Sequence, residues 1–203
     1  MQMWNPFRRP TPEERFWKWF RSNDSRLFHF ERDQERVFDE LSAELTKVHP
    51  NLCFEFGPEV DGRREFIISA DGDKKAFGAV QALAGAAPRL RKWEVIPFRP
   101  PKDLKKYPKV AYSNVELSSD DVWFSFQTEG STIHLDLYIR GLSEENETEM
   151  GGLSFLLLDS ALGEYVVETR IGGISRHPMP ENADDLELLP FPMITEVVRA
   201  DVH

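Results

Sequence analysis

The chain has 203 residues, of which 40% are hydrophobic and 30% are charged, and its formal net charge is -10. This length and composition argue against disorder and allow a core that needs no metal or disulfide to hold it. The acidic balance disfavours general binding to nucleic acid or to anionic membranes, and the single cysteine, Cys53, fits a reducing compartment.

Residues 1–10 are expected to form an N-terminal arm, and they lack the apolar run that is typical of a signal peptide. The sequence Thr11-Pro12-Glu13-Glu14 predicts a helix start: a hydroxyl cap, proline at the first position, and acids at the positive helix end. The aromatic run Phe16-Trp17-Lys18-Trp19-Phe20 follows, and we expect it to dock on the core. A membrane-surface helix is the alternative, which the neighbouring acids disfavour.

The rest of the chain predicts alternating strands and helices. Apolar residues at three- and four-residue steps predict a helix over residues 31–48. Residues 99–109 contain three prolines and several basic side chains, and we interpret them as a linker crossing the surface. Strands are predicted at 52–56, 65–70, 93–98, 110–117, 122–126, 133–139 and 165–169, helices at 75–86, 147–158 and near 191–192, and a loop at 175–185.

Two parts of the chain resemble each other. Residues 52–56 match 122–126, and residues 65–72 match 134–141, at nearly the same offset, with a glycine closing each return strand. Each hairpin is followed by a predicted helix and strand. The sequence therefore predicts two pseudo-repeated hairpin–helix–strand units, 52–98 and 122–170, within one α+β domain covering 1–203. We expect an antiparallel sheet with helices packed on one face.

Alternation along the second hairpin separates two faces. Leu135, Leu137 and Ile139 are expected to point toward the helices. The opposite face is a candidate binding or catalytic surface, in which His134 and Asp136 form an acid–base pair. The alternative is a solvated sheet face whose polar residues form cross-strand pairs. The candidate residues on this face are Trp123, His134, Asp136, Tyr138 and Arg140, with Ser125 beside them.

Other chemistries have little support in the sequence. The histidines are scattered, so we predict no metal site, and no cofactor motif such as a P-loop is present. Cys53 lies in a predicted strand, where a packed thiol is expected rather than a reactive one. The acidic run over 144–149 favours a helix start over a calcium loop.

Three segments resemble a group of bacterial proteins of unknown function: residues 16–20, 64–72 and 93–100. The resemblance covers mainly residues 13–100. It implies a bacterial cytoplasmic origin and transfers no catalytic or binding residue.

The leading hypothesis is a non-enzymatic binding or interaction protein of the cytoplasm, regulatory or immunity-type, because no catalytic motif is present. Its partner would be another protein or a second copy of the chain. The second hypothesis is a small-molecule enzyme with a site on the outer sheet face or between the two repeat units. RNA contact through the basic residues of 99–109 is the weakest interpretation.

Overall fold

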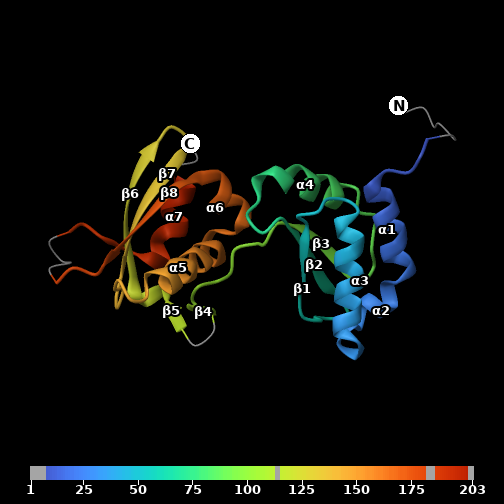
Figure 1. Ribbon diagram of the computed structural model, residues 1–203, viewed down its shortest axis with the longest axis horizontal. Helices are drawn as coiled ribbons and strands as arrows, with labels where there is room; N and C mark the ends of the chain where they lie inside the picture. The colour runs from blue at the N-terminus through green and yellow to red at the C-terminus, as the bar shows by residue number, and fades with distance from the viewer. Residues whose placement is uncertain (1–7, 113–114, 182–185, 201–203) are drawn as a thin grey trace. The chain divides into compact units, whose positions relative to one another are not determined.

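The computed structural model describes residues 8–112, 115–181 and 186–200. Contacts divide the chain into two compact units, Met1–Phe98 and Arg99–His203, and each is described by itself below (Figure 1). The boundary falls where the predicted first repeat unit ends. Each unit has its own hydrophobic cluster. Whether the two fold as the single domain expected from the sequence stays a prediction.

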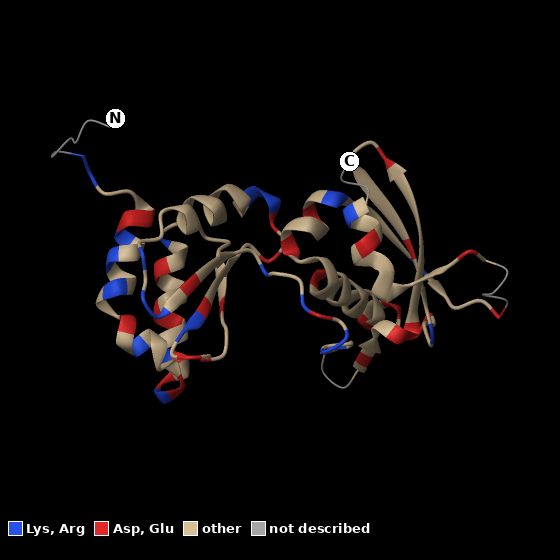
Figure 2. Ribbon diagram, turned by 180° about the vertical axis from the view of Figure 1, so that it is seen from behind, with Lys and Arg blue, Asp and Glu red and all other residues tan. Residues whose placement is uncertain are grey.

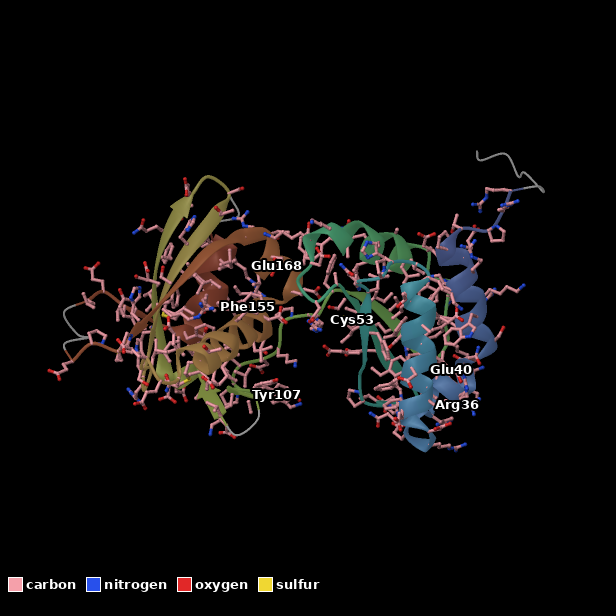
Figure 3. All side chains as sticks on the ribbon, viewed as in Figure 1. Arg36, Glu40, Cys53, Tyr107, Phe155 and Glu168 are labelled. Atoms are coloured by element: carbon pink, nitrogen blue, oxygen red, sulfur yellow. The ribbon has the colours of Figure 1, made fainter. Side chains whose placement is uncertain are left out.

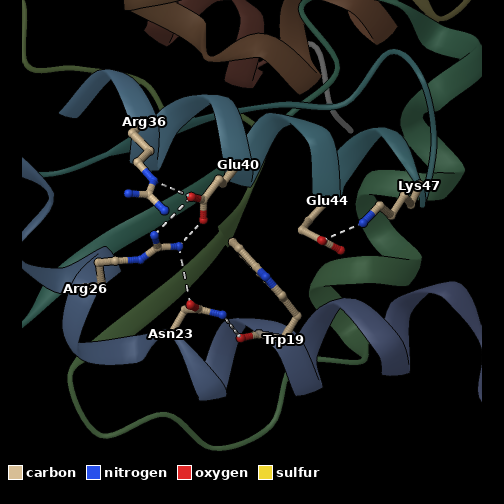
Figure 4. Close-up of polar contacts among 7 residues, drawn as sticks. All are labelled: Trp19, Asn23, Arg26, Arg36, Glu40, Glu44 and Lys47. Carbon is tan, nitrogen blue, oxygen red and sulfur yellow. Dashed lines mark hydrogen bonds and ion pairs between the residues drawn. The ribbon is translucent and has the colours of Figure 1, made fainter. Parts of the chain in front are cut away.

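The first unit opens with three helices. Helix α1 (Pro12–Ser22) begins as predicted: Glu14 N donates to Thr11 Oγ1, and the Glu14 carboxylate accepts the Thr11 N–H at 2.9 Å. Helix α2 (Asp24–Phe28) and the turn η1 (Phe30–Arg32) lead to α3 (Gln34–Thr46), which confirms the helix predicted over 31–48. Arg26 of α2 and Arg36 of α3 both pair with Glu40 (Figure 4).

A three-stranded sheet with order β1-β2-β3 completes this unit. Strands β1 (Cys53–Phe56) and β2 (Arg64–Ser69) form the predicted antiparallel hairpin. The turn η2 (Lys74–Ala76) and helix α4 (Phe77–Gly85) then lead to β3 (Trp93–Pro97). Strand β3 pairs with β2 in parallel.

The aromatic run of α1 docks on this sheet, as predicted. Phe66 of β2 is fully buried, and its ring stacks on Phe20 with 4.9 Å between centroids and on Phe16 with 6.2 Å. Trp17 is also buried, and its indole Nε1 donates to Leu83 O at 2.8 Å. That bond satisfies the one polar group of Trp17 and ties α1 to α4.

The second unit begins with a hairpin of β4 (Lys109–Tyr112) and β5 (Val115–Ser118), where the sequence predicted a single strand over 110–117. The turn η3 (Ser119–Asp121) leads into the long hairpin of β6 (Val122–Glu129) and β7 (Thr132–Ile139). The remaining elements are α5 (Glu147–Leu162), α6 (Glu164–Arg170), β8 (Ile171–Pro178), β9 (Leu189–Pro190), η5 (Phe191–Met193) and α7 (Ile194–Ala200).

The strand predicted over 165–169 is wrong: these residues belong to helix α6, and the third strand of this unit, β8, begins at Ile171. Valine pairs favour strands locally, but Val167 is buried against the second core, and such packing overrides propensity. The predicted loop over 175–185 begins too early, because β8 extends to Pro178. Residues 182–185 lie outside the described residues.

The segment predicted as a linker is fixed to the second unit. Arg99 O accepts from Glu164 N at 3.0 Å, and Glu164 Oε2 accepts from Arg99 N at 3.1 Å. Lys102 N donates to Ser160 O at 2.7 Å. Gly163, with a φ of +81°, lets this segment approach, since a Cβ there would lie 2.9 Å from Pro101 Cδ.

The sheet of the second unit has order β8-β7-β6-β9, with β7 and β8 parallel. As alternation predicted, Leu135, Leu137 and Ile139 are buried, together with Phe124 of β6, and they pack in one cluster with residues of α5 and α7. The class is α+β, as predicted. The sequence predicted an antiparallel sheet; the described strands form three separate sheets, and the pairs β2–β3 and β7–β8 are parallel.

Both units contain the same order of elements: a hairpin, then helical segments, and then a strand that pairs in parallel with the second strand of the hairpin. The third strands do not keep the offset of the hairpins, so a duplication stays a prediction. Within the described residues, no single helix has the length and apolar character to cross a membrane; α5 and α6 meet those criteria only together, with a bend of 109° between them.

Candidate functional site

The face of the β8-β7-β6-β9 sheet opposite the helices carries the candidate residues, and we call it the outer face. Strand register arranges its side chains in three rows that cross β6, β7 and β8. Parallel pairing of β8 with β7 adds a third member to each row that the hairpin alone does not contain. The rows are Trp123–Tyr138–His177, Ser125–Asp136–Ser175 and Gln127–His134–Gly173.

His177 lies at the centre of the contacts on the outer face. Its Nε2 lies 3.0 Å from Asp136 Oδ1, and the two side chains are 43% and 32% exposed. The imidazole also stacks on the Tyr138 ring, with 5.1 Å between centroids and 30° between planes. One histidine therefore holds both an acid and an aromatic side chain in fixed positions.

Trp123 is held in a second group at the edge of the same face. The guanidinium of Arg140 lies 5.1 Å from the Trp123 ring centroid, a cation–π contact. Arg140 Nη1 also lies 3.2 Å from Asp121 Oδ1, so a carboxylate on η3 orients the guanidinium. Strand β9 flanks Trp123 on its other side, where Pro190 is its register partner.

The His134 ring lies close to the backbone of two glycines, Gly172 and Gly173, on the neighbouring strand β8. A Cβ at Gly173 would lie 2.7 Å from His134 Nδ1, and one at Gly172 would lie 3.0 Å from His134 Nε2. The glycine pair therefore makes room for the imidazole, because a larger residue at either position would meet the His134 ring. His134 Nε2 lies 3.3 Å from Glu129 Oε2 at the end of β6.

The outer face is hollowed beside His134. A cavity of about 490 Å³ is lined by residues of all three strands, among them His134, Asp136 and Ser175. This volume falls within the range of small-molecule sites. The cavity is open and its walls are largely polar, with Gln127 and Glu129 at one side.

The predicted pair of His134 with Asp136 does not form; Asp136 meets His177, and His134 meets Glu129. His134 and Asp136 are neighbours on the same face of β7, but neither contacts the other. Asp136 contacts a residue of the adjacent strand β8, and His134 contacts a residue at the end of the β6–β7 hairpin. Sequence reasoning missed His177 because it placed this residue in a loop. The sequence did contain a signal for this position. Gly173, Ser175 and His177 are spaced two residues apart, so a strand that starts near Ile171 places all three on one face.

The opposite side of β8 carries an inward-facing charge. Arg176 Nε donates to Ser154 Oγ at 2.7 Å, and Ser154 is buried in α5. Burial lowers the pKa of the Arg176 guanidinium, and the nearby Glu147 partly opposes that shift. Among the described residues β8 is an edge strand, and an inward-pointing charge is one way in which natural sheets discourage further strand pairing.

The hairpin of the first unit has no comparable exposed face. At its outward positions Ile67 and Ser69 are buried, at 7% and 0% exposure. Cys53 is half-buried on β1, opposite Ser69 (Figure 3). Across the ranges that the structure describes, no three His, Cys, Asp or Glu side chains are grouped to hold a metal ion.

The outer face therefore brings together aromatic, basic and acidic side chains that contact one another. Comparison of the chain with protein-family models, with curated proteins and with solved structures found no match.

Proposed function

We propose that the chain is a non-enzymatic binding protein of the bacterial cytoplasm, regulatory or immunity-type, and that it binds a protein partner through the outer face. The observation that carries this proposal is the grouping of Trp123, Tyr138 and Arg140 on that face. Tryptophan, tyrosine and arginine are the residue types that dominate binding energy in protein interfaces.

The contacts within the face support the same proposal. Trp123 is packed against Arg140, and Tyr138 is packed against His177, so these side chains have already lost much of their rotamer freedom. Ordering a free side chain at an interface costs about 0.5–1.5 kcal/mol, and a side chain held beforehand avoids much of that cost. The partner is another protein or a second copy of this chain.

Site-specific photo-crosslinking in the native host tests the proposal. A photoreactive phenylalanine analogue at Ser125 stands in the middle row, beside Asp136. We expect a discrete adduct, whose mass identifies either a partner or a second copy. The matched control carries the same analogue at Tyr112, which is 71% exposed on the β4–β5 hairpin. It should give no such adduct.

Alanine variants then assign the binding energy. With the partner purified, Trp123→Ala and Tyr138→Ala should each weaken binding by about 2 kcal/mol, or roughly 30-fold, measured by calorimetry. Tyr112→Ala removes an aromatic side chain that is more exposed than Trp123 or Tyr138 and lies on a different hairpin, so it should leave the affinity unchanged. Equal effects of all three variants, or adducts at both crosslinker positions, would contradict the proposal.

A second candidate function is a small-molecule enzyme, and the cavity beside His134 and Asp136 is the observation that favours it. Among the described residues the hydrogen-bond partner of His177 is the Asp136 carboxylate and not a hydroxyl, so a serine nucleophile activated by this histidine has no support. The test is turnover in a metabolite extract, followed by mass spectrometry. Conversion that His134→Gln and Asp136→Asn both abolish would favour the enzyme over the binding protein.

A further inference from the structure

A cavity of about 550 Å³ lies in the second unit and away from the outer face. Its walls come from three places: the segment 101–108, the turn at Ser119 and Asp120, and the packed ends of α5 and α7. Ala161 of α5 and Thr195 of α7 meet there, where Thr195 Oγ1 donates to Ala161 O at 3.4 Å. The cavity therefore joins parts of the chain that are far apart in sequence.

The wall formed by 101–108 is held in place by backbone hydrogen bonds. Lys102 N donates to Ser160 O at 2.7 Å, and Ser119 N donates to Pro108 O at 2.7 Å. Between these two anchors, the Asp103 carboxylate accepts the Lys105 N–H at 2.9 Å. A ligand bound there meets a surface that needs little ordering, which lowers the cost of binding.

Three basic side chains line this cavity, Lys102, Lys105 and Arg199. None of the three has an ion-pair partner among the described residues, although the chain as a whole is acidic. Two carboxylates, Asp103 and Asp120, also line the cavity, so basic groups outnumber acidic ones by three to two. Basic residues of this segment lie along its course in Figure 2.

The structure also divides the basic residues of 99–109 into two sets. Lys102 and Lys105 line the cavity. Lys106 lies 5.1 Å from the centroid of the Tyr107 ring, and Lys109 pairs with Glu116 at 3.3 Å. Tyr107 is labelled in Figure 3. An RNA-binding surface would use all of these charges together against the phosphates of one RNA strand. Among the basic residues of this segment, only Lys102 and Lys105 line the cavity.

We propose that this cavity binds a small phosphate-bearing ligand, with Lys102, Lys105 and Arg199 as its cationic contacts. The cavity presents three positive charges, from two ammonium groups and one guanidinium, which is more than a ligand with a single carboxylate needs. Three cationic donors match the higher charge and the several oxygens of a phosphate group. Asp103 and Asp120 are acceptors for hydroxyl or amino groups of the same ligand. This site is independent of the outer face and of the function proposed above.

Calorimetric titration of the full chain with inorganic pyrophosphate at low salt tests the proposal. We expect saturable one-to-one binding below about 1 mM, and at least about tenfold weaker binding for Lys102→Gln/Lys105→Gln and for Arg199→Gln. Lys106→Gln is the matched control: it removes the neighbouring charge outside the cavity and should leave the affinity unchanged. Unchanged circular dichroism melting curves establish that each variant is folded. If either Lys102→Gln/Lys105→Gln or Arg199→Gln fails to fold, the other variant still tests the proposal.

Four results would overturn the proposal. The first is no heat of binding up to about 10 mM pyrophosphate. The second is equal weakening by Lys106→Gln, which would show a diffuse electrostatic effect. The third is equal affinity for citrate, which would assign the site to anions in general rather than to phosphate. The fourth is RNA retention that depends on Lys106 and Lys109 as much as on Lys102, which would show a nucleic-acid surface along the segment instead of a small-molecule site.

Discussion

Arg64 is the most deeply buried basic residue described, and its replacement should destabilise the first unit. It opens β2 with a side chain only 7% exposed. Its guanidinium lies 5.3 Å from the Phe28 ring centroid and 5.0 Å from that of Phe30. Nη1 donates to Gly57 O at 3.1 Å, and Nη2 pairs with Glu31. One side chain therefore joins the hairpin loop to the end of α2 and to η1.

The expected cost of Arg64→Met follows from these contacts. The hydrogen bond from a charged group to Gly57 O contributes about 1.5–3 kcal/mol. Each cation–π contact contributes about 0.5–2 kcal/mol, and the apolar methionine retains part of the packing. The pair with Glu31 adds little, because Glu31 is 53% exposed. We expect a loss of about 3 kcal/mol in the free energy of unfolding, and a smaller loss for Arg64→Lys, which keeps the charge.

Urea unfolding followed by tryptophan fluorescence measures this loss. Trp123 is the sole tryptophan after residue 98, so a Trp123→Phe background confines the signal to the first unit. The matched control is Arg63→Met, because Arg63 is adjacent and exposed; we expect a change within about 0.5 kcal/mol. If Arg64→Met costs no more than Arg63→Met, the contacts of Arg64 do not stabilise the fold and the reasoning is refuted.

Three further predictions concern single positions. Hydrogen bonds from Arg26 and then Arg36 lower the pKa of Glu40 from 4.5 to about 2. The ionised Glu40 therefore stabilises the fold above pH 4.5, and this contribution is lost as the pH falls toward 2. The urea midpoint should fall less over that pH range in Glu40→Gln than in the unmodified protein. Gly173→Ala places a methyl group against the His134 ring; it should cost about 1–3 kcal/mol, and less in a His134→Ala background, as a double-mutant cycle of urea unfolding would show. Arg176→Leu removes the inward charge of β8, and we expect concentration-dependent self-association in sedimentation experiments; a strictly monomeric variant would show that Arg176 does not protect this edge.

Several local features followed from the sequence because short-range physics decides them. The cap of α1 depends on residues three apart, Thr11 and Glu14, and it formed as predicted. Alternation along β7 depends on a two-residue period, so the burial of Leu135 and Leu137 and the exposure of His134 were predictable. The aromatic helix docked because removing its large apolar side chains from water is favourable, and Phe16, Trp17 and Phe20 are buried in the first core.

Tertiary structure decided the features that depend on distant residues. Residues 164–170 became helix because Val167 packs in the core and Glu164 binds Arg99, contacts that no local window contains. The partner of Asp136 is His177, 41 residues away, because β8 pairs in parallel with β7. Parallel pairing requires a long crossover connection, here the helices α5 and α6, and the register that results cannot be read from alternation. The sequence by itself thus determined which side chains share the outer face of one hairpin, and the long-range pairing determined which of them touch.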